Sequence, residues 1–111
     1  MIRVVTKADR DLRPIELPGA SVQVSDPIIG QQDCLSAGFT EYDAPSRLEW
    51  TFDYNEVFYL LEGSLEIQEG DSEPITFGVG DLGYIEKGSH VFITVPERAY
   101  LLHVTQPAWR D

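Results

Sequence analysis

The stretch that decides the fold is residues 50–63, W-T-F-D-Y-N-E-V-F-Y-L-L-E-G, in which an aromatic and aliphatic run ends at a glycine. One carboxylate, Glu56, opens the apolar part, and Gly63 folds it back into the alternating residues 65–68. A second glycine-punctuated stretch, residues 80–88 (G-D-L-G-Y-I-E-K-G), follows about one hairpin later. Both stretches predict short strands joined by tight turns.

The rest of the chain repeats this pattern of short alternating segments, and turn signals such as Pro18-Gly19 and Asp26-Pro27 stand between them. No window of adequate length has the helical period, and residues 7–13 are predicted to be a solvated stretch or one helical turn. Because residues 57–61 are apolar on both faces, they should be covered on both sides, as in a barrel strand. The sequence therefore predicts an all-β fold, a small antiparallel barrel or sandwich. The predicted strands are residues 2–6, 21–25, 35–43, 47–52, 56–61, 65–68, 75–79, 82–85, 91–95 and 99–105.

The chain of 111 residues suffices for one domain with one core. Its formal net charge of −11 would repel a phosphate backbone and an anionic membrane, so we expect neither nucleic acid nor membrane as a partner. No apolar stretch approaches a membrane span, and residues 1–7 lack the apolar core of a signal peptide. The single cysteine, Cys34, is predicted to be a buried structural thiol, and the whole favours a cytoplasmic protein.

Two motifs resemble those of the cupin superfamily. Glu56, six residues and Gly63 match the end of the first cupin motif, and Gly80, five residues and Glu86-Lys87-Gly88 match the second. Residues 50–56 and the ending Gln106-Pro107-Ala108-Trp109 resemble the ethanolamine-utilization (EutQ-like) type of small cupin. The resemblance covers residues 35–109 as the cupin core. It implies a jelly-roll barrel and a single domain over residues 1–111, in which residues 1–34 form an N-terminal strand or arm.

The chain departs from the cupin motifs where cupins usually hold a metal. Counted back from Glu56, the two histidine slots of the first motif fall on Trp50 and Phe52, or one residue earlier at each, and the slot of the second motif falls on Val91. Of the usual three histidines and one glutamate only Glu56 remains, so we expect no metal and no other cofactor. One alternative stays open, a metal held by rearranged ligands drawn from Glu41, Glu49, Glu56 and His103.

Glu56 is the residue on which the functional predictions depend. Its side chain should point to the same side of its strand as Phe58. If that side is the barrel interior, burial raises the pKa of the carboxyl toward the range of a general acid or base, and the phenol of Tyr54 or Tyr84 could assist. The alternative is a structural role, in which Glu56 caps a corner by accepting backbone N–H bonds near Tyr54-Asn55.

Aromatic residues are concentrated around the position of Glu56. Beside one carboxylate such rings can cage an amine or ammonium ion, at on the order of 1–2 kcal/mol per good ring contact, although core packing is their usual role. Lys87 could reach a ligand carboxylate at the barrel mouth or be a solvated turn residue, and His90 and His103 could both be hydrogen-bonded sheet residues. The predicted cage is Trp50, Phe52, Tyr54, Phe58 and Tyr84, and the other predicted ligand contacts are Glu41, Lys87 and His103.

Three functional hypotheses follow. The first is a metal-free cupin that holds a small polar or cationic ligand in an aromatic-lined barrel anchored by Glu56. The second is an isomerase- or lyase-type enzyme in which Glu56 moves a proton, and the third is a metal-dependent enzyme with rearranged ligands. In each case the partner is a small molecule, and apolar strands with a free N-terminal strand predict a homodimer. The tail 106–111 is expected to hold Trp109 against the outside of the barrel.

Overall fold

A computed structural model describes residues 1–31 and 34–110 of the chain. These residues form one short 3-10 turn, η1 (Lys7–Asp9), and ten strands. The strands are β1 (Arg13–Leu17), β2 (Ala20–Ile28), β3 (Ser36–Tyr42), β4 (Ser46–Thr51), β5 (Asn55–Gly63), β6 (Leu65–Glu69), β7 (Ile75–Phe77), β8 (Leu82–Ile85), β9 (His90–Val95) and β10 (Ala99–Gln106).

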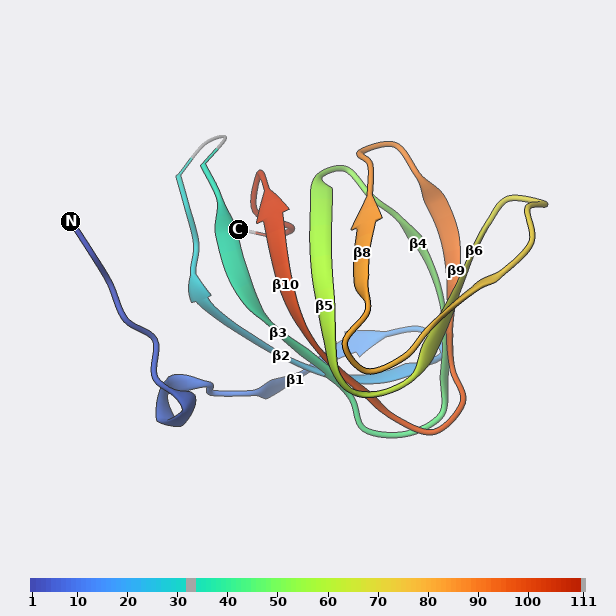
Figure 1. The fold of residues 1–111 in the computed structure, drawn as a ribbon, viewed down its shortest axis with the longest axis horizontal. Helices are drawn as coiled ribbons and strands as arrows, with labels where there is room; N and C mark the ends of the chain where they lie inside the picture. The colour runs from blue at the N-terminus through green and yellow to red at the C-terminus, as the bar shows by residue number, and fades with distance from the viewer. Residues whose placement is uncertain (32–33, 111) are drawn as a thin grey trace.

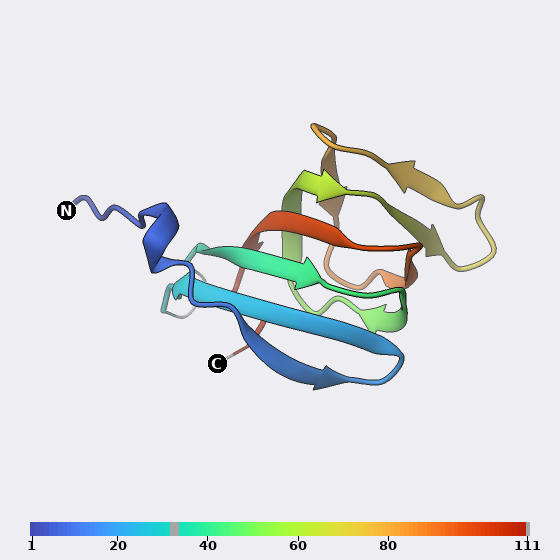
Figure 2. The same ribbon diagram turned by 90° about the horizontal axis from the view of Figure 1, so that it is seen from below.

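The strands form two antiparallel sheets that face each other (Figures 1 and 2). The larger sheet has the order β1-β2-β3-β10-β5-β8, and the smaller has the order β4-β9-β6-β7. Strands far apart in sequence are neighbours, since the last strand, β10, lies between β3 and β5. The predicted all-β antiparallel barrel is confirmed.

The core lies between the two sheets because side chains alternate along each strand. In β5, Phe58 and Leu60 point inward and are buried, and in β9 Val91, Ile93 and Val95 do the same from the opposite sheet. The strand predicted at residues 91–95 is thereby confirmed.

Two predicted glycine turns shape the ends of β5. Gly63 has a positive φ of 79°, and a side chain there would run into the backbone carbonyl of Arg98. At the entry to β8, Gly80 has a φ of 91° and its N–H donates to the Leu60 carbonyl at 2.9 Å. The Asp81 carboxylate accepts from the Gly78 N–H at 2.8 Å and closes this turn, so the G-V-G-D stretch is the tight connection from β7 of the smaller sheet to β8 of the larger one.

The N-terminal third differs from the sequence prediction. Residues 2–6 are not a strand, and they extend away from the sheets with Ile2 and Val4 exposed (Figures 1 and 2). The edge position beside β2 is taken instead by β1, which the sequence analysis did not predict. Pro27 does not end β2, because a register shift between Ser25 and Ile28 accommodates it near the end of the strand.

Two burial predictions are wrong. Val57 and Tyr59 are 38% and 41% exposed, so residues 57–61 are covered on the inner face only within this chain. Their outer face was expected to meet a packed layer, but the described part of the chain supplies no such layer. Cys34 is exposed, since it lies in the β2–β3 connection outside the barrel wall.

Candidate functional site

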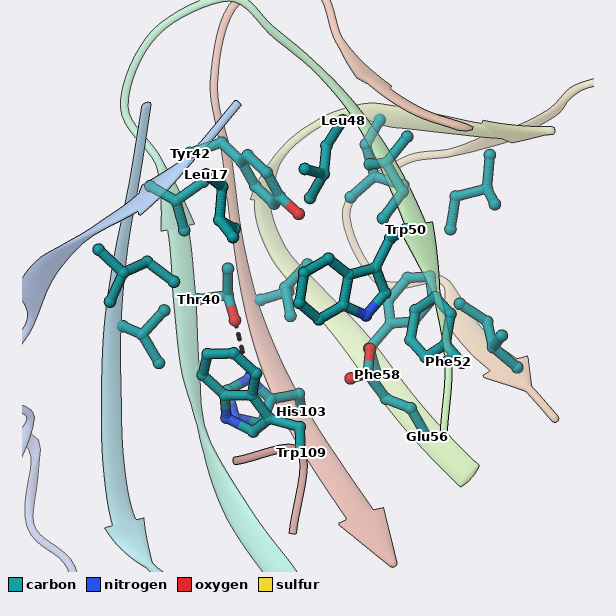
Figure 3. A pocket seen from close by; sticks show the side chains of 18 of the residues that line it. Leu17, Thr40, Tyr42, Leu48, Trp50, Phe52, Glu56, Phe58, His103 and Trp109 are labelled. Atoms are coloured by element: carbon teal, nitrogen blue, oxygen red, sulfur yellow. Dashed lines mark hydrogen bonds between the residues drawn. The ribbon is translucent and has the colours of Figure 1, made fainter. Parts of the chain in front are cut away.

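A pocket opens between the two sheets (Figure 3). The cavity has a volume of about 70 Å³, several times what one water molecule needs. Strands of both sheets contribute to its wall, and most lining side chains are aliphatic or aromatic. Its aromatic residues are Tyr42, Trp50, Phe52, Tyr54, Phe58 and Trp109, and its polar groups besides the tyrosine hydroxyls and tryptophan N–H groups are Thr40, Glu56 and His103.

Glu56 is the carboxyl of this pocket. It begins the inward-facing row of β5, two residues before Phe58, as predicted (Figure 3). Burial raises the pKa of Glu56 from an ordinary value of 4.5 to about 8, so the isolated protein holds it mostly neutral at pH 7. Within the described residues its carboxyl makes no hydrogen bond or ion pair. Across the strand pair, the Thr105 hydroxyl is also buried without a hydrogen-bond partner in that part of the chain.

The corner-capping alternative for Glu56 is not what the structure contains. The side chain of Asn55, one residue earlier, accepts the Lys87 N–H at 2.8 Å and joins the two corners. Glu56 is therefore left without the structural partners that would explain a buried carboxyl in that role.

The wall beside Glu56 carries a bonded aromatic pair. The indole N–H of Trp50 donates to the Tyr54 hydroxyl oxygen at 2.9 Å, and the ring of Tyr54 packs edge-on against Phe52 at 5.2 Å between centroids. Burial and the nearby charge of Glu56 raise the pKa of the Tyr54 phenol, so it stays protonated. Because its oxygen accepts from Trp50, its proton is left for another acceptor.

A second polar group lies on β3 and β10. His103 Nδ1 is 2.8 Å from Thr40 Oγ1 (Figure 3). Its Nε2 is 3.3 Å from Asp26 Oδ1 on β2. The Asp26 side chain is 8% exposed, and it also accepts the Trp109 indole N–H and the Arg110 Nε–H, each at 2.8 Å. Burial opposes ionisation here, but the hydrogen bonds and the Arg110 charge lower the pKa of Asp26 below its ordinary value.

The C-terminal tail forms part of the pocket wall. Trp109 packs edge-on against Trp50 and His103, with 6.4 Å between ring centroids in each case. It lines the pocket and contacts the core, so the expectation that the tail holds it against the outside is wrong. The prediction failed because the bond to Asp26 joins residues 83 positions apart.

The structure brings together most of the predicted site. The three predicted residues outside the pocket are Tyr84, Lys87 and Glu41. Tyr84 is 64% exposed on the outer face of β8, and Lys87 is exposed in the turn after it. Glu41 pairs with Arg98 at 3.1 Å on the outer side of β3. The predicted residues that line the pocket are Trp50, Phe52, Tyr54, Glu56, Phe58 and His103.

The arrangement needed for rearranged metal ligands is absent from the described residues. Glu49 faces outward and pairs with His90 at 2.7 Å, and Glu41 is engaged with Arg98. No group of three or more histidine, cysteine or carboxylate side chains gathers in the part of the chain that the structure describes. The alternative left open, in which Glu41, Glu49, Glu56 and His103 converge, is not found in the described residues, because strand alternation turns the first two to the outside.

Four residues of the site were not predicted as site residues from the sequence: Thr40, Tyr42, Asp26 and Trp109. The first two share the inward face of β3, a signal present in the alternation around Phe39. Asp26 extends the inward row of Val22 and Val24 by one step, but Asp26-Pro27 was interpreted as a strand end. Only Trp109 had no local signal.

Two facing antiparallel sheets around an inner pocket define a cupin barrel. An RmlC-like cupin from Shewanella frigidimarina shares this fold with a TM-score of 0.73 at 18% identity, over 96% of this chain and 91% of that one. The family model described as "Ethanolamine utilisation protein EutQ" matches residues 6–111, and the chain belongs to that family. The EutQ-like resemblance expected from the motifs is thus confirmed.

Individual relatives agree with this family. The EutQ protein of Clostridioides difficile, in its solved structure, has a TM-score of 0.75 at 27% identity, with 96% of this chain and 82% of that chain covered. Proteins named "Acetate kinase EutQ" are 37% identical over 63 residues in C. difficile and 31% identical over 87 residues in Salmonella typhimurium. Those matches cover 57% and 76% of this chain but only 40% and 37% of the relatives.

The chain therefore spans about two fifths of the length of the curated relatives it matches. Among the residues that the structure describes, no helix has the length and apolar character needed to cross a membrane.

Proposed function

We propose that the protein binds a small organic cation in the barrel pocket, with Glu56 as its counter-ion and aromatic side chains around it. The observation that carries this proposal is an inward-facing carboxyl that has no hydrogen-bond or ion-pair partner within the described residues, in a mostly apolar, ring-lined pocket. Ionising a carboxyl at pH 7 costs about 1.4 kcal/mol for each unit by which its pKa exceeds 7. The pKa of Glu56 is about 8, so its ionisation costs about 1.4 kcal/mol. Two ring contacts at on the order of 1–2 kcal/mol each, together with the ion pair, exceed that cost.

Charge supports the same class of ligand. The formal net charge of −11 attracts cations and repels phosphates. Acetate and phosphoryl donors are anions. The pocket therefore does not support an acetate kinase activity, which the name of the relatives implies, for this chain. Ethanolamine, after which the family is named, is a small organic cation at neutral pH.

Calorimetric titration with choline and with its uncharged isostere 3,3-dimethylbutan-1-ol tests the proposal. Choline should bind and the isostere should bind at least ten-fold more weakly. Because only ionised Glu56 pairs with the cation, choline affinity should rise about ten-fold per pH unit up to pH 8 and then level off. Glu56→Gln should remove this pH dependence and most of the affinity.

Glu49→Gln is the matched control, since Glu49 is a carboxylate on the outer face paired with His90. Its choline affinity should equal that of the wild type. Equal binding of choline and its isostere, or no choline binding at pH 9, would contradict the proposal.

A proton-transfer enzyme is the second candidate, favoured by one observation. Tyr54 accepts the Trp50 N–H, which leaves the phenol proton for a substrate beside a carboxyl with a pKa near 8. For a substrate that the protein isomerises or cleaves, Glu56→Gln should lower kcat at least a hundred-fold. Tyr84→Phe should leave kcat unchanged, because Tyr84 lies outside the pocket. Full turnover in Glu56→Gln would exclude this mechanism.

A further inference from the structure

The pocket has a second polar side chain that none of the functional hypotheses uses. Thr40 lines the pocket from β3, and its hydroxyl meets His103 Nδ1 at 2.8 Å (Figure 3). His103 is buried, with its side chain 4% exposed, and its other ring nitrogen faces the Asp26 carboxylate. Three residues from three strands thus form a chain that ends at the pocket.

The hydrogen-bond directions in this chain follow from Asp26. It is ionised and can only accept, because it is already the acceptor for Trp109 and Arg110. His103 Nε2 must therefore carry the proton that faces Asp26. When the imidazole is neutral, Nδ1 is an acceptor and the Thr40 hydroxyl donates to it, and this is the arrangement on which the inference below is built.

Thr40 consequently offers the pocket an acceptor. Once its single proton is directed to His103, only the lone pairs of Oγ1 remain. Within the described residues no other hydrogen bond involves Oγ1, so these lone pairs are available to a group in the pocket.

Thr40 and Glu56 stand at separate places in the barrel. Thr40 pairs with Leu101 of β10, which pairs with Leu60 of β5, so Thr40 lies two strands from β5 and four residues along from Glu56. Strand geometry places their backbones about 10 Å apart across the sheet and about 13 Å apart along it. Both side chains point into the barrel (Figure 3).

We infer that Thr40 is a second ligand contact, oriented by His103 and Asp26, and that the ligand carries a hydrogen-bond donor several bonds away from its cationic group. This inference rests on the proposed function, since Glu56 holds the cationic end. It specifies an elongated ligand with a positive head and a donor-bearing tail, such as a hydroxyl or amide N–H.

The test uses trimethylammonium ions bearing an ω-hydroxyalkyl chain of two to six carbons. Each is compared by calorimetry with the alkyl ion of equal length and with the ω-methoxy ion, at pH 9, where Glu56 is ionised. At the chain length that reaches Thr40, the hydroxyl ion should bind roughly three- to ten-fold more tightly than the alkyl ion, the usual net effect of one hydrogen bond. The methoxy ion, which cannot donate, should show no such gain.

Variants of Thr40 isolate the contact. Thr40→Val should abolish the preference for the hydroxyl ion while leaving the affinity for the alkyl ion within two-fold, and Thr40→Ser should retain the preference. Thr40→Ala gives the same comparison if the valine variant is unstable. In His103→Phe the Thr40 hydroxyl is free to donate to the ligand. The affinity for the methoxy ion should therefore rise relative to the affinity for the hydroxyl ion.

The two proposals fail differently. If alkyl ions bind but no chain length shows the preference, or the preference survives Thr40→Val, the Thr40 inference is wrong and the proposed function stands. If neither class of ion binds the wild type, both are wrong.

Discussion

At the scale of the residue, Glu56 is costly to the free protein. Its carboxyl has no partner within the described residues, so burial alone determines its pKa and favours the neutral acid. Arg98, in contrast, is exposed and pairs with both Glu41 and Glu62 on the surface. A group that is kept buried without a partner is better explained by what enters the pocket than by stability.

The cost should be visible as a dependence of stability on pH. The folded pKa of Glu56 is raised to about 8 from 4.5, so the folded state binds more protons than the unfolded state between these values. The free energy of unfolding should therefore fall as pH rises from 4.5 to 8, by up to about 1.4 kcal/mol per unit from this group. Urea denaturation of wild type and Glu56→Gln at pH 5, 6, 7 and 8 measures the difference. The wild type should lose stability relative to the variant at each step, and parallel curves would show that Glu56 ionises normally.

At the scale of the element, the C-terminal tail closes one side of the pocket through a bond to β2. Trp109→Phe keeps a ring against Trp50 but removes the N–H that donates to Asp26. The expected loss is roughly 1.5–3 kcal/mol in the free energy of unfolding, as for a hydrogen bond to a charged group. Guanidinium denaturation of wild type and variant checks it.

Asp26→Asn supplies the control for this bond. Trp109→Phe and Asp26→Asn disturb the same hydrogen bond. The loss in the free energy of unfolding of the double variant should therefore be smaller than the sum of the losses of the two single variants. Strict additivity would mean that the tail and β2 are not coupled.

Strand β8 gives a second element-scale prediction. A side chain on Gly83 would overlap the ring of Phe58, which packs over it from β5. Gly83→Ala should cost roughly 1–3 kcal/mol by overpacking, and it should also distort the pocket, since Phe58 lines it. Gly78→Ala, where the added methyl meets only the Asp81 carboxylate at 3.8 Å, should change stability by less than 1 kcal/mol. Thermal unfolding compares the pair, and equal losses would contradict the packing argument.

The elements themselves were predictable where a local cause determines them. Alternation and glycine turns located most of β2 through β10, and alternation put Glu56 on the same side of its strand as Phe58, the side that the structure shows to line the pocket. The features that could not be predicted from the sequence depend on contacts between residues far apart in the chain. Trp109 lines the pocket only because Asp26 is there to receive its N–H. Residues 2–6 are rich in β-branched residues and were predicted to be a strand, but β1 occupies the edge that they would need.

At the scale of the whole molecule, charge and apolar surface act in opposite directions. The net charge of −11 keeps copies of the chain apart, and the repulsion is long-ranged at low salt. The outer face of β10, β5 and β8 nevertheless carries two rows of apolar side chains in register. These rows are Val104, Val57 and Tyr84, and Leu102, Tyr59 and Leu82.

The exposed rows make self-association the expected state, with this face as the interface. Leu82 is 67% exposed and Tyr59 41%, so a second copy would bury both and cover the outer face of residues 57–61. Because like charges oppose the association, the dimer should tighten as sodium chloride rises from 50 to 500 mM. Sedimentation equilibrium measures both the state and its salt dependence. Tyr59→Glu and Leu82→Glu should each shift the protein to monomer. Ile75→Glu should not, since Ile75 is 60% exposed on β7 of the other sheet. A wild type that stays monomeric at 100 µM in 500 mM salt, or an Ile75→Glu variant that dissociates as readily, would show that these rows are not the interface.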